Sequence, residues 1–173
     1  MPELSSRYCA DSIPVTAVQA ACGCAVHPNT ITLFNLIIVT PIIMILLMGP
    51  NWQVLLAISL IRGVFDIADG TLARKCGLTS KLGAVLDIGS DTIFIWAILA
   101  TVVYARRGEV GPGFIGLAAL VGTTSAWQFF QEIGDTAPRP MTLVETLVAD
   151  NSIVTTPLLT MAAWLYIHTD SLW

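Results

Sequence analysis

Charge is what this sequence has least of. Only 12% of its 173 residues are Asp, Glu, Lys or Arg, whereas about 25% is usual in soluble domains. Lys and Arg together number eight, too few for the basic stripe with which proteins bind nucleic acid. The four cysteines do not predict a disulfide framework, since the chain is neither small nor rich in cysteine. The composition therefore argues against an ordinary soluble domain and against a partner made of nucleic acid.

Long apolar segments take the place of charge. Hydrophobic residues make up 55% of the chain, and a membrane-spanning helix needs roughly 20 mostly apolar residues in succession. Such segments cover residues 31–48, 52–74, 82–105, 112–131 and 151–168, with a short amphipathic segment at 141–149. We predict an all-α, multi-pass integral membrane protein with a single domain, 1–173. It is expected to be a bundle of five to six transmembrane helices, with residues 14–26 lying along the lipid interface.

The few basic residues indicate how the chain is oriented in the membrane. With the N-terminus in the cytosol, the inner segments hold most of them: Arg7, Arg74, Lys75, Lys81 and Arg139. The outer segments hold Arg106 and Arg107. Because basic residues favour the cytosolic side, we expect the loop at 75–81 to face the cytosol.

Four aspartates interrupt two of the apolar segments. Asp66 and Asp69 stand three residues apart in 52–74, and Asp87 and Asp91 stand four apart in 82–105. These spacings place each pair on one face of its helix. The loop between the two segments is short, so we expect antiparallel neighbours whose acidic faces lie opposite each other near the cytosolic end.

Acidic side chains inside a membrane protein need an explanation, because a charge at the bilayer centre costs at least ~2.5–3.5 kcal/mol. Carboxylates this close cannot all stay ionised without compensating cations. Arg62, one turn before Asp66, can neutralise one of them. Carboxylate oxygens also suit Mg²⁺ or Mn²⁺, and four carboxylates can hold two such ions. The alternative is ordinary helix-end charges paired with nearby Lys and Arg.

The aspartates belong to a longer pattern. The sequence contains Asp66-x2-Asp69-Gly70-x2-Ala73-Arg74-x8-Gly83-x3-Asp87-x3-Asp91. At every fixed position and spacing this resembles the signature of the class I CDP-alcohol phosphotransferases, also called CDP-alcohol phosphatidyltransferases, which make phospholipids from CDP-linked precursors. Upstream, "HPNTIT" at 27–32 resembles the Pro-Asn-x-x-Thr segment that opens the first spanning helix in many members. A plain helix start capped by Asn29 or Thr30 is the alternative for that segment.

The resemblance implies an enzyme with a defined set of site residues. A phosphatidyl group would pass from a CDP-alcohol, most often CDP-diacylglycerol, to an acceptor alcohol, with release of CMP. Two Mg²⁺ or Mn²⁺ ions would be held by the four aspartates, and Asp91 would be the general base. The CDP moiety would bind at the following residues: Asn29, Thr32, Gly70, Ala73 and Arg74.

The acceptor stays open among glycerol 3-phosphate, inositol or its phosphate, serine and another lipid. Lys81 and Arg139 are the candidates for binding it, although a simple cytosolic charge is the alternative for both. The resemblance also implies a homodimer in a lipid bilayer. Two other functions compete with the enzyme: a divalent-cation transporter, and a non-catalytic membrane partner that keeps the fold. Transporters tend to place their ligands near the membrane midplane, whereas these acids cluster towards one end.

Overall fold

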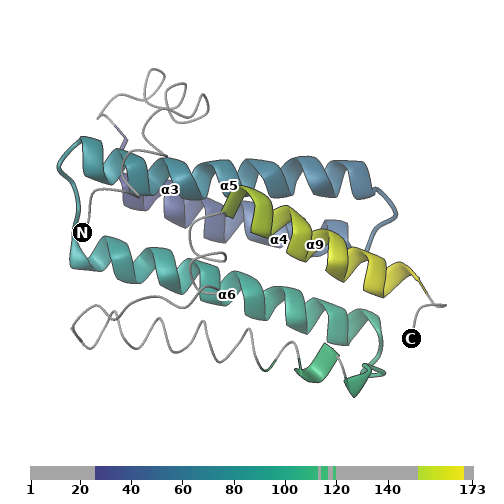
Figure 1. Cartoon of the computed structure of the whole chain (residues 1–173). Coiled ribbons are helices and arrows are strands. Elements are labelled where there is room, and N and C mark those ends of the chain that lie inside the picture. Colours follow the sequence, from purple (N-terminus) through teal and green to yellow (C-terminus); the bar gives the residue numbers. More distant parts are fainter. Residues whose placement is uncertain (1–25, 113, 117–118, 120–151, 170–173) are drawn as a thin grey trace.

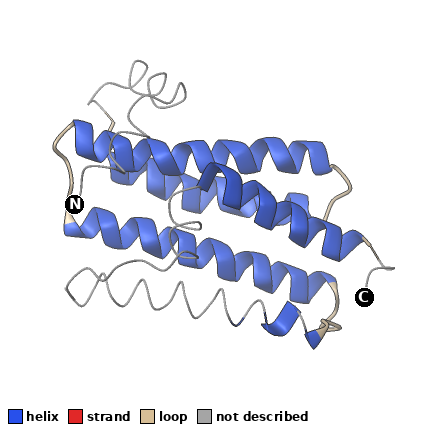
Figure 2. Ribbon diagram, in the orientation of Figure 1, coloured by secondary structure: helices blue, strands red, loops and turns tan. Residues whose placement is uncertain are grey.

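The computed structural model describes residues 26–112, 114–116, 119 and 152–169. Within these ranges the regular structure is helical, without strands (Figure 2). In chain order the main elements are α3 (Pro28–Phe34), the π-helix η1 (Asn35–Val39), α4 (Thr40–Leu47), α5 (Trp52–Lys75), α6 (Lys81–Ala105) and α9 (Ser152–His168). They run lengthwise as a bundle (Figure 1). Most of the predicted segments 14–26 and 112–131, and all of 141–149, lie outside the described residues.

The first three elements form one continuous helix, Pro28–Leu47. Pro28 is well placed at its first turn, where no intrahelical N–H is needed. His27 is the N-cap, since its side chain accepts a hydrogen bond from the Asn29 backbone N–H at 3.3 Å. The alternative with Asn29 or Thr30 as the cap is therefore wrong. The π-helical turn lies just before Pro41, a residue that cannot donate to the preceding turn and strains a regular helix.

Two caps define the loop between α5 and α6. Gly77 has φ +66°, the left-handed conformation that commonly ends a helix. The Leu78 N–H donates to the Ala73 carbonyl at 2.8 Å, which completes a Schellman motif. At the start of α6, the Ser80 hydroxyl accepts from the Gly83 N–H at 3.0 Å. Cys76 within this loop is disulfide-bonded, contrary to the expectation from the sequence.

α5 and α6 are antiparallel, but they are not the close neighbours that the short loop predicts. α5 packs mainly against α9 and α3, and α6 packs against the same two elements. Figure 1 shows the first helix and α9 between them. A loop of five residues, 76–80, reaches up to roughly 17 Å when extended, which is enough to pass one helix. The expectation of directly adjacent helices is therefore wrong.

The buried core of the bundle is apolar, and so is much of its surface. The core cluster consists of Val39, Ile43, Leu47, Leu55, Phe94, Ile98, Val102 and Ala163. On the outside, Ile37 and Ile45 are 62% and 66% exposed. Soluble proteins rarely expose many large apolar side chains together, so this surface suits lipid.

Two of the described helices are long and apolar enough to cross a membrane, Pro28–Leu47 and Lys81–Ala105. α9 has 17 residues, and α5 carries charged residues throughout its second half. The described residues thus support a helical membrane protein, while the count of five to six spans stays a prediction.

Candidate active site

A cavity of about 180 Å³ lies where α3 and α6 begin and α5 ends. Four parts of the chain line it. The first helix and α5 contribute Pro28, Asn29, Thr32, Asp69, Gly70, Ala73 and Arg74; the loop and α6 contribute Leu78, Thr79, Ser80, Gly83, Ala84 and Asp87. The structure therefore brings together in one cavity every residue predicted to bind the CDP moiety, together with two of the four aspartates. Their roles remain predictions.

The two glycines of the signature, Gly70 and Gly83, differ in how much space surrounds them. A Cβ atom at Gly70 would lie 3.5 Å from the Arg74 guanidinium, an ordinary contact. A Cβ at Gly83 would lie 3.2 Å from both the Asn29 side-chain oxygen and the Ser80 hydroxyl, closer than most real contacts. Packing among the described residues thus accounts for Gly83 but not for Gly70. At Gly70 the missing side chain leaves space in the cavity.

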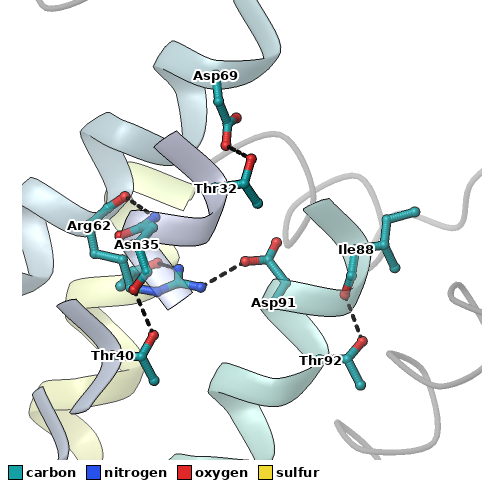
Figure 3. Close-up of polar contacts among 9 residues, drawn as sticks. Thr32, Asn35, Thr40, Arg62, Asp69, Ile88, Asp91 and Thr92 are labelled. Atoms are coloured by element: carbon teal, nitrogen blue, oxygen red, sulfur yellow. Dashed lines mark hydrogen bonds and ion pairs between the residues drawn. The ribbon is translucent and has the colours of Figure 1, made fainter. Parts of the chain in front are cut away.

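Asp69 is the buried carboxylate of the cavity, with 4% of its surface exposed. The Thr32 hydroxyl donates to its Oδ2 at 2.6 Å (Figure 3). Its Oδ1 is buried and has no hydrogen-bond partner among the described residues. An unpaired buried carboxylate oxygen is unfavourable, and such oxygens are the ligands that Mg²⁺ and Mn²⁺ prefer. The donor set at this position therefore fits a divalent cation.

Asp87 lines the cavity from α6, whereas Asp66 and Asp91 are not part of its wall. Asp91 forms an ion pair with Arg62, whose Nη2 lies 2.9 Å from the Asp91 Oδ1. Arg62 does neutralise an aspartate, as expected. Its ion-pair partner is on α6, however, and not the neighbouring aspartate of its own helix, because the guanidinium extends across the bundle (Figure 3).

The four aspartates do not already form a closed metal cage. Among the described residues, no group of three or more His, Cys, Asp or Glu side chains is arranged to hold a metal ion. Mg²⁺ is usually bound by one or two carboxylates together with substrate phosphates and water. Asp69 and Asp87 on one cavity match that pattern. Two ions held by all four aspartates stay a prediction.

The predicted cationic residues differ in their position relative to the cavity. Arg74 lines the cavity, and its Nη2 donates to the Thr71 hydroxyl at 3.4 Å. Lys81 is the first residue of α6 and does not line the cavity. Arg139 lies outside the described residues.

The sequence did not lead us to expect that Leu78, Thr79 and Ser80 line the cavity. A signal was available, because these residues fall in the interval of eight between Arg74 and Gly83 of the signature.

Comparison with known proteins assigns the family. Residues 25–169 match the CDP-alcohol phosphatidyltransferase family, so the chain belongs to that family and the resemblance is confirmed. The family is generally dependent on divalent cations and is associated with membranes.

One curated relative is a CDP-diacylglycerol–glycerol-3-phosphate 3-phosphatidyltransferase from Aquifex aeolicus (strain VF5). It is 27% identical over 85 residues, which are 49% of this chain and 47% of the relative. The chain thus matches about half the length of that relative. No solved structure matches the chain.

Proposed function

We propose that this protein transfers a phosphatidyl group from CDP-diacylglycerol, or a related CDP-alcohol, to the hydroxyl of an acceptor alcohol and releases CMP. The observation that carries the proposal is the cavity at the end of α5. It joins both halves of the signature around the Asp69 Oδ1, which has no hydrogen-bond partner in the described part of the chain. Family membership supports the same chemistry.

The donor would occupy this cavity with its nucleotide against α5. Gly70 and Ala73 present little side-chain volume there, and Arg74 adds a positive charge on the same wall. Guanidinium groups pair well with phosphates. Asn29 and Thr32 face the donor from the first helix. Small and cationic groups on one wall suit a nucleotide whose pyrophosphate is anionic.

Asp69 and Asp87 are the residues that would hold a divalent cation in the cavity. When bound, such a cation neutralises the charge on the pyrophosphate and on the leaving group. Asp66, on the same face of α5, and Asp91 would complete a second site. The relevant ion is Mg²⁺ or Mn²⁺, because the donors are carboxylate oxygens.

Asp91 is the proposed general base. Its carboxylate accepts the proton of the acceptor hydroxyl while that oxygen forms a bond to the phosphorus bearing the diacylglycerol. The bond from this phosphorus to the bridging oxygen breaks, and CMP leaves with the electron pair. The transfer therefore needs no reactant besides the CDP-linked donor and the acceptor alcohol.

The proposal also includes the acceptor alcohol, the oligomeric state and the orientation in the membrane. The name of the Aquifex relative makes glycerol 3-phosphate the first acceptor to test. Lys81 and Arg139 are the proposed contacts for its phosphate. We further propose a multi-pass homodimer whose cavity opens towards the cytosol, so that the lipid donor reaches it from the membrane.

The test is CMP release by purified protein in detergent with Mg²⁺ or Mn²⁺ and CDP-diacylglycerol. Glycerol 3-phosphate, inositol, inositol phosphate and serine are supplied one at a time. We expect release with one acceptor, abolished by EDTA and by Asp91→Asn in a variant that still folds. Unchanged release by Asp91→Asn would contradict the assignment of the base. If no acceptor supports CMP release and the protein carries metal ions into proteoliposomes, a cation transporter would be favoured.

A further inference from the structure

Arg62 is the largest fully buried side chain among the described residues, with 1% of its surface exposed. It lies one turn before the first aspartate of the signature and belongs to no position of that signature. Burying a guanidinium is unfavourable unless it is well paired. Its Nε has no hydrogen-bond partner within the described part of the chain, so its hydrogen bonding is incomplete. Stability alone does not explain why an arginine stands here.

Two other helices, α6 and α9, hold the Arg62 guanidinium in place. Nη2 lies 2.9 Å from the Asp91 Oδ1 on α6, and Nη1 donates to the Thr156 hydroxyl on α9 at 3.4 Å. The guanidinium carbon lies 3.7 Å from the ring centroid of Phe94, also on α6. In addition, the Asn35 amide donates to the Arg62 carbonyl at 3.2 Å (Figure 3). A guanidinium fixed on this many sides has little rotational freedom.

The ion pair acts on only half of the Asp91 carboxylate. The Asp91 side chain is 46% exposed, so its burial does not fix its orientation. Among the described residues its one hydrogen bond is through Oδ1, to Arg62. Oδ2 is thereby left to face a reacting group. Because the arginine fork is rigid and planar, it determines the direction in which Oδ2 points.

We propose that Arg62 is a positioning residue: it holds Oδ1 of Asp91 so that Oδ2 is presented to the acceptor hydroxyl. This inference rests on the proposed function, in which Asp91 is the base. The hydrogen bond from Arg62 Nη1 to Thr156 makes α9 part of the positioning.

The first test replaces Arg62 with Gln and with Lys. Residues that orient a reacting group typically contribute about 10- to 100-fold to activity. We expect kcat to fall by this factor in Arg62→Gln, with partial recovery in Arg62→Lys. The KM for CDP-diacylglycerol should stay unchanged, since Arg62 does not line the cavity. In an Asp91→Glu background, where the carboxylate is already displaced, Arg62→Gln should cost much less.

A matched pair of variants on α9 separates positioning from stability. Thr156 bonds to Arg62, and one turn further the Thr160 hydroxyl bonds to Ser59 of α5 at 2.9 Å. Both hydroxyls are buried and both join α9 to α5. Thr156→Val should lower kcat, whereas Thr160→Val should lower the melting temperature and leave kcat unchanged. This pair keeps the inference testable if Arg62→Gln does not fold.

The ion pair between Arg62 and Asp91 can also be tested through thermal stability, without measuring catalysis. In EDTA, the losses of melting temperature in Arg62→Gln and Asp91→Asn should not add in the double variant, because each removes the same ion pair. If wild-type protein releases CMP but Arg62→Gln keeps kcat within about twofold, the positioning role is wrong and the proposed function stands. A lower metal requirement in Arg62→Gln, with kcat preserved, would also overturn it. Absence of CMP release in wild type would refute the proposed function itself.

Discussion

The two ends of the helical bundle are built on different principles. At the closed end, where α4, α6 and α9 end and α5 begins, polar groups are tied to one another. The Trp164 indole donates to the Gly49 carbonyl at 2.9 Å, and a ring nitrogen of His168 lies 3.1 Å from the Leu47 carbonyl. At the cavity end, small side chains leave an open volume, and one oxygen of Asp69 has no hydrogen-bond partner among the residues that the structure describes.

The same helices supply both ends, so the difference lies in the side chains. Along α6, Phe94, Ile98 and Val102 continue the apolar core towards the closed end, while Gly83, Ala84 and Asp87 line the cavity at the other. Proteins commonly depart from the best local packing at functional sites and compensate elsewhere. The closed end stabilises the bundle, and the cavity end is available for a ligand.

The largest effect is expected from Asp69→Asn. This change keeps the size of the side chain but removes the charge that would hold a cation, an interaction worth several kcal/mol to the transition state. CMP release should therefore fall by at least about 100-fold. The melting temperature in EDTA should hold or rise, because a buried charge has been removed. Activity within tenfold of wild type, measured in the same assay, would remove Asp69 from the site.

Gly70→Ala should separate stability from binding. Alanine is favoured over glycine within a helix by up to about 1 kcal/mol, and the new Cβ meets only an ordinary contact. We therefore expect a higher melting temperature together with a higher KM for CDP-diacylglycerol. Gly83→Ala is the matched control: its Cβ would crowd Asn29 and Ser80, so it should lower the melting temperature. An unchanged KM in Gly70→Ala would show that the nucleotide does not lie against this residue.

The smallest effect is expected at the closed end. Trp164→Phe removes the hydrogen bond to the Gly49 carbonyl and leaves most of the ring volume. The free energy of unfolding should fall by about 0.5–1.5 kcal/mol, read as a lower melting temperature in detergent. The turnover number should not change. If kcat fell as far as it does in Asp69→Asn, the two ends would not be functionally distinct.

The apolar segments predicted the described helices well, because helix formation depends on local sequence, and the resemblance to the family signature named several residues that the cavity brings together. The interval between Asp66 and Asp69, and that between Gly83 and Asp87, place residues on one face of a helix whatever the tertiary fold. The loop between α5 and α6 contains Gly77 and the cap Ser80, whose conformational and capping preferences are local and could have located these helix ends. Family membership could be predicted because the whole signature at 66–91 can be read from the sequence.

The relations between helices could not be predicted in this way. A short loop suggested that α5 packs against α6, yet the first helix and α9 lie between them. Arg62 was expected to neutralise one of the four aspartates, and it does, but the spacing did not indicate that this would be Asp91 on α6. The cap is His27, whereas the better cap formers Asn29 and Thr30 lie two and three positions later. The packing of the helices and the partner of Arg62 depend on which surfaces pack together, and a single sequence does not specify that.

The most direct test of the central claim is Mn²⁺ binding by the purified protein, followed by electron paramagnetic resonance with and without CDP-diacylglycerol. If the cavity end holds both cation and donor, wild-type protein and Trp164→Phe should bind Mn²⁺ more tightly when the donor is present. Asp69→Asn and Asp87→Asn should lose that gain. Equal Mn²⁺ binding by all four proteins, unaffected by the donor, would contradict the account.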